Sequence, residues 1–108
     1  MSATLPEPLS AYFGAKNRHD IDAMLAPFSA DAVVKDESRE SGSLAAIREW
    51  MEETTRKYRD TVEVTDVAEA DGRTIVTGLV SGTFPGSPAQ LRFAFTLEDG
   101  KIIRLEIG

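Results

Sequence analysis

The chain has 108 residues, 42% of them hydrophobic and 28% charged, which is typical of one folded domain spanning residues 1–108 and not of a disordered segment. A formal net charge of −6 speaks against nucleic acid or an anionic membrane surface as a partner, because both attract positively charged proteins. The absence of cysteine excludes disulfides and thiolate chemistry. No signal peptide and no apolar run of ~18 residues is evident, so we expect a cytoplasmic protein.

Two short helices are predicted at the start of the chain. Pro6 and Pro8 suit a first helical turn, where the missing N–H of proline is not needed. Asp20 is a good N-cap for the second helix, and Pro27 marks its end. The residues that follow helical spacing are Leu9, Tyr12, Phe13 and Lys16 in the first helix, and Ile21, Met24, Leu25 and Phe28 in the second.

A short strand over residues 32–36 and a polar loop over residues 37–43 come next. Ser43 is suited to cap a third helix, which helical spacing extends from Leu44 to Tyr58. Trp50 lies beside the apolar stripe of this helix. The stripe itself is formed by Leu44, Ile47, Met51, Thr54 or Thr55, and Tyr58.

In the second half of the chain, apolar residues alternate with polar ones, which is the period of strands. Val67 breaks the parity set by Val64, and a β-bulge near Asp66 explains the break and turns Asp66 outward. A regular strand would instead turn Asp66 inward, where it would be a second acid. Asp71 and Gly72 form a strong hairpin signal.

The last three strands, over residues 74–84, 91–97 and 102–107, are predicted to form an antiparallel meander. Helices followed by strands favour an α+β fold. The face opposite the helices is too apolar for a bare surface and too charged for a core, so we predict a homodimer through it. In that dimer Arg104 and Glu106 would pair across the two-fold axis. The inward residues are Leu91, Phe93, Phe95 and Leu97, and the outward ones are Arg92, Ala94, Ile102, Arg104 and Glu106.

The order of elements and three motifs resemble the nuclear transport factor 2-like fold. The motifs are Phe-Ser-Ala-Asp-Ala-Val-Val-Lys-Asp at residues 28–36, Gly-Ser-Leu-Ala-Ala-Ile-Arg-Glu-Trp at 42–50 and Asp-Gly-Lys-Ile-Ile-Arg-Leu at 99–105. The resemblance implies a cone in which about three N-terminal helices and a curved antiparallel (mixed) sheet enclose a pocket. Within this superfamily the chain is similar to SnoaL-like polyketide cyclases and to ketosteroid isomerases.

This resemblance implies two catalytic residues. Asp36 matches the position of the family's base, and Tyr12 matches the tyrosine that donates a hydrogen bond to the oxyanion. The match ends there, because the inward positions of residues 91–97 hold no carboxylate and Met51 stands where some isomerases have a tyrosine. An apolar environment would raise the pKa of Asp36 and prepare it to move a proton next to a carbonyl group.

Other candidates have simpler readings. The predicted walls of the pocket are Trp50, Phe84, Phe93, Phe95 and Met51, although such residues also fill cores. Tyr12 can equally be a core aromatic, and Asp36 a solvated residue at a strand end. His19 is predicted to be exposed and not catalytic, and no metal or cofactor is expected, because one histidine and no cysteine leave only carboxylates as further ligands.

The resulting hypothesis is a SnoaL-like or ketosteroid-isomerase-like enzyme that transfers a proton on a small apolar carbonyl compound, by isomerisation or aldol-type cyclisation. The alternative is a non-catalytic ligand-binding or dimerisation module of the same fold. An ionisable Asp36 that faces an apolar pocket would favour the enzyme. A collapsed pocket with Asp36 in water would favour the module.

Overall fold

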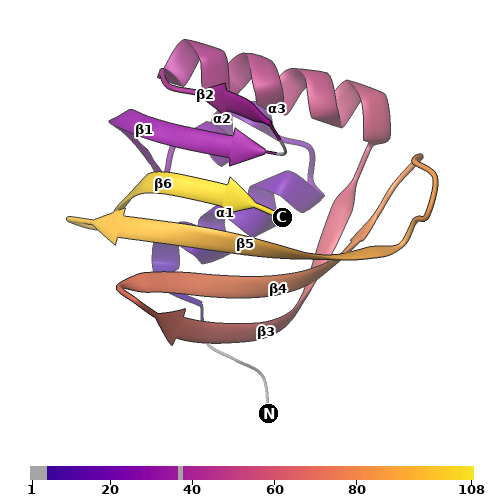
Figure 1. Ribbon diagram of the computed structural model, residues 1–108. Helices are drawn as coiled ribbons and strands as arrows, with labels where there is room; N and C mark the ends of the chain where they lie inside the picture. The colour runs from indigo at the N-terminus through magenta and orange to yellow at the C-terminus, as the bar shows by residue number, and fades with distance from the viewer. Residues whose placement is uncertain (1–4, 37) are drawn as a thin grey trace.

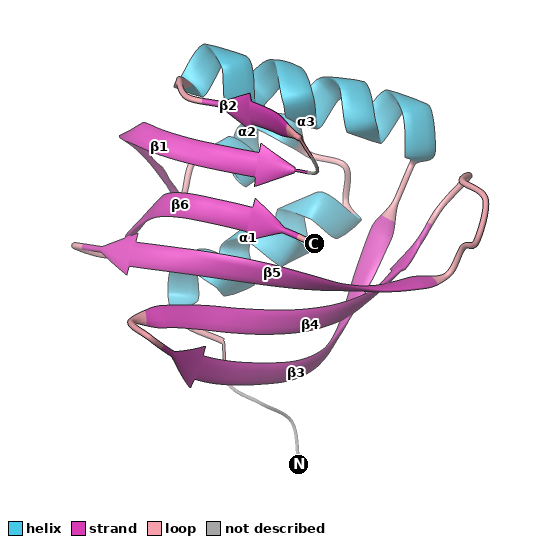
Figure 2. Ribbon diagram, viewed as in Figure 1, coloured by secondary structure: helices cyan, strands magenta, loops and turns pink. Residues whose placement is uncertain are grey.

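In the computed structural model, which describes residues 5–36 and 38–108, three helices lie against one face of a curved, unclosed sheet of six strands (Figure 1). Figure 2 shows the helices on the far side of the sheet, with α3 along its upper edge. The α+β prediction is confirmed. The predictions for residues 1–4 and Glu37 lie outside the described residues. The elements are α1 (Glu7–Asn17), α2 (Ile21–Leu25), β1 (Phe28–Asp36), β2 (Arg39–Ser41), α3 (Leu44–Tyr58), β3 (Thr61–Ala70), β4 (Arg73–Ser81), β5 (Ala89–Glu98) and β6 (Lys101–Ile107).

The strand order is β2-β1-β6-β5-β4-β3. Strands β1 and β6 are parallel, and every other neighbouring pair is antiparallel. The ends of β1 and β6 meet in register, because Asp36 is opposite Ile107. This pairing places the predicted base at the edge where two neighbouring strands stop.

The helix boundaries follow the predicted caps. The side chain of Asp20 accepts a hydrogen bond from the Ala23 N–H at 3.2 Å, and that of Ser43 accepts one from the Ala46 N–H at 3.1 Å. Helix α3 ends at Tyr58, and its C-cap residue Arg59 has a φ of 49°, in the left-handed region that often closes a helix. These contacts confirm both predicted N-caps.

Register shifts in β3 and in β6 decide which of their side chains face the core. The register of β3 on β4 shifts between Val64 and Asp66, and Asp66 is exposed, as the predicted bulge requires. A second shift lies in β6, where Ile102 is opposite Leu97 and Arg104 is opposite Thr96, with Ile103 between them. The prediction that Ile102 faces outward was therefore wrong, and this residue is fully buried in the core.

The strand boundaries also needed correction. The predicted polar loop over residues 37–43 contains β2, which pairs with β1 in an antiparallel arrangement. Strand β1 begins at Phe28 and not at residue 32, and β4 ends at Ser81 and not at residue 84. Residues 82–88 instead connect β4 with β5.

The core lies between the helices and the inner face of the sheet. Aromatic rings from α1 and β5 dominate it, and Tyr12, Phe13, Phe93 and Phe95 contact one another edge to face or stacked. Phe93 is 2% exposed and Phe95 is fully buried, so the predicted inward face of β5 is confirmed at these positions. None of the described helices has the length and hydrophobicity needed to cross a membrane.

Candidate functional site

A cavity of about 380 Å³ opens between the C-terminal half of α3, the β4–β5 connection and the inner face of the sheet. Three side chains of the charged residue types, from distant parts of the chain, line it: Lys16, Asp36 and Asp60. The remaining lining residues are Trp50, Thr54, Tyr58, Val80, Phe84, Pro85, Ala89, Leu91, Phe93 and Ile107. Charged groups among aromatic walls are the features of a small-molecule site.

Asp36 lies on the wall of this cavity, at the end of β1. The indole Nε1 of Trp50 donates a hydrogen bond to its Oδ2 at 3.1 Å, and the indole is itself only 4% exposed. The carbonyl of Trp50 accepts a hydrogen bond from the Thr54 hydroxyl at 3.0 Å. A packed helix therefore fixes the direction of the half-buried carboxylate.

The predicted walls divide into two groups. Trp50, Phe84 and Phe93 line the cavity, whereas Met51 and Phe95 are fully buried core residues. The Phe95 ring is stacked beside Phe93, with centroids 6.5 Å apart. Phe84 lies in the β4–β5 connection and contacts the ring of Tyr58 edge to face, with centroids 5.8 Å apart.

The β4–β5 connection is held against the end of α3. The Thr83 N–H donates to the Tyr58 carbonyl at 2.8 Å, and the Thr83 hydroxyl lies 3.1 Å from the Lys57 carbonyl. A Cβ on Gly82 would lie 2.6 Å from the Tyr58 carbonyl oxygen, so only glycine permits this approach. Phe84 is thus placed at the cavity by the contacts of the two residues that precede it.

Tyr12 lies deeper than the lining residues. It is fully buried, and its ring contacts Phe13, Phe28 and Phe95 edge to face. Its hydroxyl is buried and has no hydrogen-bond partner within the described residues. Burial, and then the negative charges of Asp60 and Asp36, raise the pKa of Tyr12 far above its usual range. The hydroxyl therefore stays neutral and is a donor without an acceptor.

An ion pair that sequence reasoning missed connects α1 to Asp60, the residue just before β3. The Nζ of Lys16 lies 3.0 Å from Oδ2 of Asp60, and the two side chains are 7% and 12% exposed. Oδ1 of Asp60 is buried without a hydrogen-bond partner within the described residues. One signal in the sequence could have indicated this ion pair: Lys16 lies at helical spacing from Tyr12 and Phe13. A charged residue on such an apolar stripe is seldom buried without a partner.

His19 and Asp66 lie apart from the cavity lining. His19 is exposed, as predicted, and has a φ of 56°, a left-handed conformation. Its Nε2 lies 3.0 Å from the main-chain carbonyl of Asp60, so it ties the end of α1 to the segment after α3. Asp66 is exposed on β3. The described residues contain no group of three or more His, Asp or Glu side chains placed to hold a metal ion.

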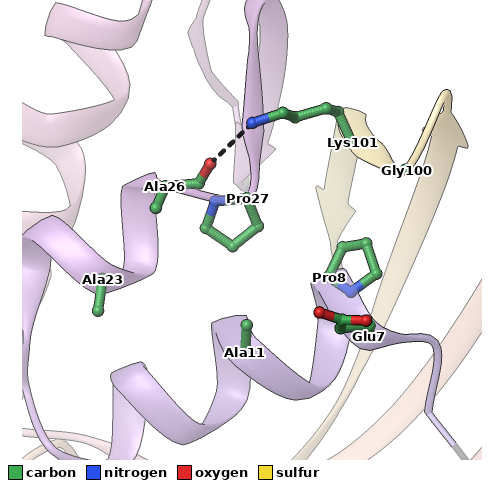
Figure 3. A pocket seen from close by; sticks show the side chains of 8 residues that line it. All are labelled: Glu7, Pro8, Ala11, Ala23, Ala26, Pro27, Gly100 and Lys101. Atoms are coloured by element: carbon green, nitrogen blue, oxygen red, sulfur yellow. Dashed lines mark hydrogen bonds between the residues drawn. The ribbon is translucent and has the colours of Figure 1, made fainter.

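A second hollow, of about 470 Å³, lies between the start of α1, α2 and the β5–β6 turn. Figure 3 shows its small lining side chains, with Lys101 reaching across to the Ala26 carbonyl at 3.4 Å. Its two ionisable residues, Glu7 and Lys101, are exposed. A site that excludes water needs buried polar groups, so the cavity at Asp36 is the better candidate.

Comparisons with known proteins agree on the fold. The sequence profile of the SnoaL-like domain matches residues 9–105. A structure from Sinorhizobium meliloti, provisionally identified as a polyketide cyclase, is 36% identical with a TM-score of 0.92, over 96% of this chain and 95% of that one. A similar provisional polyketide cyclase from Pseudomonas putida is 24% identical with a TM-score of 0.81, over 99% of this chain and 92% of that one.

A third structure carries a bound molecule. It is a protein from Catenulispora acidiphila with a ketosteroid isomerase-like fold, in complex with trimethylamine. It is 18% identical with a TM-score of 0.83, over 97% of this chain and 86% of that one. Among curated protein sequences, none matches this chain significantly.

Proposed function

This chain belongs to the family of SnoaL-like domains, and from that premise we propose that it is an enzyme that transfers a proton on a small apolar carbonyl compound. Asp36 would remove the proton next to the carbonyl group. It would return the proton to another carbon in an isomerisation, or to the alkoxide oxygen that forms with the new C–C bond in an aldol-type cyclisation. The substrate would lie between Trp50, Phe84 and Phe93.

One observation carries this proposal: the carboxylate of Asp36 lies on the wall of an aromatic cavity, and Trp50 holds it there at 3.1 Å. A base must be held in a fixed direction to reach a carbon-bound proton, because proton transfer needs close and aligned partners. The hydrogen bond from the indole to Oδ2 supplies that direction.

Two of the related structures support the substrate class in general terms. The Sinorhizobium meliloti protein is provisionally a polyketide cyclase, and aldol-type cyclisation of a polyketide begins with removal of a proton next to a carbonyl group. The Catenulispora acidiphila protein holds trimethylamine, a small molecule with apolar methyl groups. Both are consistent with a small-molecule ligand for the cavity of this chain.

A homodimer through the outer face of the sheet remains part of the proposal. The burial pattern leaves Ile75 and Leu79 of β4 partly exposed on this face, beside Ala94 of β5. Arg104 and Glu106 pair with each other within one chain, with Nε and Oε2 2.6 Å apart, and not across a two-fold axis as the sequence predicted. Their charges are already compensated, which lowers the cost of covering them with a second subunit.

The test is exchange of carbon-bound protons. A panel of small apolar ketones would be incubated with the protein in deuterated buffer, and loss of the α-proton signals would be followed by NMR. We expect the wild type to catalyse exchange with at least one ketone and Asp36→Asn to lose it. Asp31→Asn is the matched control, because Asp31 is exposed on the same strand.

Two results would argue against the enzyme. If Asp36→Asn exchanged as fast as the wild type, Asp36 would not be the base. If ketones bound to the wild type without exchange, the non-catalytic binding module would be the better description. One observation favours that alternative, since the described residues on the inner face of β5 supply no second acid to stabilise an enolate.

A further inference from the structure

Tyr12 and Lys16 lie four residues apart on α1, so their side chains share one face of the helix. Their surroundings differ. Tyr12 is enclosed by aromatic rings and is fully buried, whereas Lys16 is one of the residues that line the cavity. A ligand in the cavity would thus meet the ammonium group of Lys16 before the hydroxyl of Tyr12.

The ammonium group is held but not saturated. Within the described residues its ionic partner is Asp60, at 3.0 Å from Nζ. An ammonium group has three N–H donors, and Asp60 occupies one. The side chain of Lys16 is only 7% exposed, so little water competes for the other two. A charged donor on a side chain with so little exposure interacts strongly with any oxygen that enters the cavity.

We infer that Lys16, and not Tyr12, binds and stabilises the negatively charged oxygen of the bound carbonyl compound. The inference rests on the proposed function. When Asp36 takes the α-proton, the C–H bond breaks and its electron pair moves through the adjacent carbon to the carbonyl oxygen. Lys16 donates hydrogen bonds to that enolate oxygen, and Asp36 then returns the proton to carbon, so neither oxidant nor reductant is needed.

The ion pair explains how a lysine can serve here. Asp60 offsets the positive charge of the largely buried Lys16 side chain and fixes the position of Nζ. With Asp60 engaged by Lys16, the cavity has the carboxylate of Asp36 to accept a proton and the ammonium group of Lys16 to meet the negative charge that develops. Lys16 thus supplies the second stabilising group that the inner face of β5 lacks.

A binding experiment with 2-naphthol tests the inference without the natural substrate. Its ionised form resembles an enolate, and its fluorescence distinguishes the neutral molecule from the anion. We would use Asp36→Asn as the parent protein, because the amide mimics the protonated acid that is present together with the enolate. A nearby cation favours the anion, so we expect the bound probe to ionise at lower pH than in solution.

Three variants in this parent isolate the effect. Lys16→Met should abolish the shift in ionisation. If this single variant is unstable, the double variant Lys16→Met with Asp60→Asn replaces it, because it leaves no unpaired buried carboxylate. The double variant should abolish the shift as well. Lys101→Met also removes one positive charge, but at the start of β6, about 20 Å along the strand from Ile107 at the cavity. It should leave the shift unchanged.

In the exchange assay with Asp36 present, Lys16→Met should slow exchange by about 100-fold or more, on the scale of one oxyanion donor. Tyr12→Phe should slow it by less than tenfold. The inference would be overturned if 2-naphthol did not bind, if its ionisation were the same with and without Lys16, or if Tyr12→Phe abolished the shift. A failure of the proposed function is separately visible, as exchange that does not depend on Asp36.

Discussion

Trp50 and Asp36, fourteen positions apart in the sequence, are joined by a hydrogen bond of 3.1 Å from the indole Nε1 to Oδ2. The bond connects α3 to the end of β1 at the cavity wall. Trp50→Phe removes the donor and keeps an aromatic ring. We expect the hydrogen bond to contribute about 1–2 kcal/mol, because the carboxylate is half-buried and partly solvated. A double-mutant cycle with Asp36→Ala, measured by urea unfolding, isolates this coupling, and additive single effects would contradict it.

Phe93→Ala should be strongly destabilising. Phe93 is 2% exposed and contacts Phe13 and Phe95, so its removal leaves a cavity that rigid neighbours cannot fill. We expect a loss of about 3–5 kcal/mol in the free energy of unfolding. Phe84→Ala, in the partly exposed β4–β5 connection, is the matched control and should cost less. Equal losses for the two variants would mean that the core is not where the structure places it.

Tyr12 should make the protein sensitive to alkali. Its pKa is raised in the folded state, so above pH ~10 the unfolded chain releases the phenol proton while the folded chain retains it. The unfolded state then binds fewer protons, and stability falls by about 1.4 kcal/mol per pH unit for this group. Urea unfolding of the wild type and Tyr12→Phe between pH 9 and 11 gives the difference.

The phenylalanine variant should also be as stable as the wild type, or more stable, near pH 7. It loses only a buried hydroxyl that lacks a partner within the described residues, and such a group costs about 1–3 kcal/mol. A clear destabilisation at neutral pH would show that the hydroxyl has a stabilising partner.

His19→Ala should leave ligand binding nearly intact. The side chain is exposed, and among the described residues its hydrogen-bond contact with the site is to the main-chain carbonyl of Asp60. We expect a modest loss of stability, of about 1 kcal/mol, from that contact and from placing alanine at a left-handed φ. Calorimetric titration with 2-naphthol would check this, and a large drop in affinity with the fold intact would contradict it.

The proposed dimer predicts the effect of a charge at its centre. Ala94 is half-buried on the outer face of β5, opposite Glu106 and Ile75 of the neighbouring strands. Ala94→Arg would bring two like charges together at a two-fold interface and should convert the dimer to a monomer. Light scattering at micromolar concentration would report the change, and a monomeric wild type would refute the dimer.

The fold was predictable where local signals agreed. Ser43 as a cap and continuous helical spacing fixed α3 at Leu44–Tyr58, and the break in parity at Val67 correctly located a bulge. The extra residue in β6 was not predictable, because Ile102 and Ile103 are equally hydrophobic and either can face inward. Strand β2 was missed because its three polar residues form a strand only by pairing with β1.

The site was predictable only in part. A resemblance placed Asp36 correctly beside a cavity, and its hydrogen bond with Trp50 could not be read from either residue alone. The pairing of Lys16 with Asp60 joins residues 44 positions apart and depends on how α1 lies across the sheet. Sequence spacing within one helix can show that a lysine is out of place, but only the tertiary fold supplies its partner.

The parallel pairing of β1 with β6 has a consequence for how the chain folds. Strand β6 is the sole link within the described sheet between the β1–β2 pair and the β3–β5 meander. Its partner β1 is more than sixty positions earlier in the sequence, so the loop that closes when they pair is long and its closure is entropically costly. We therefore expect folding in milliseconds to seconds, without a stable half-sheet, because neither part of the sheet reaches the other until β6 is in place.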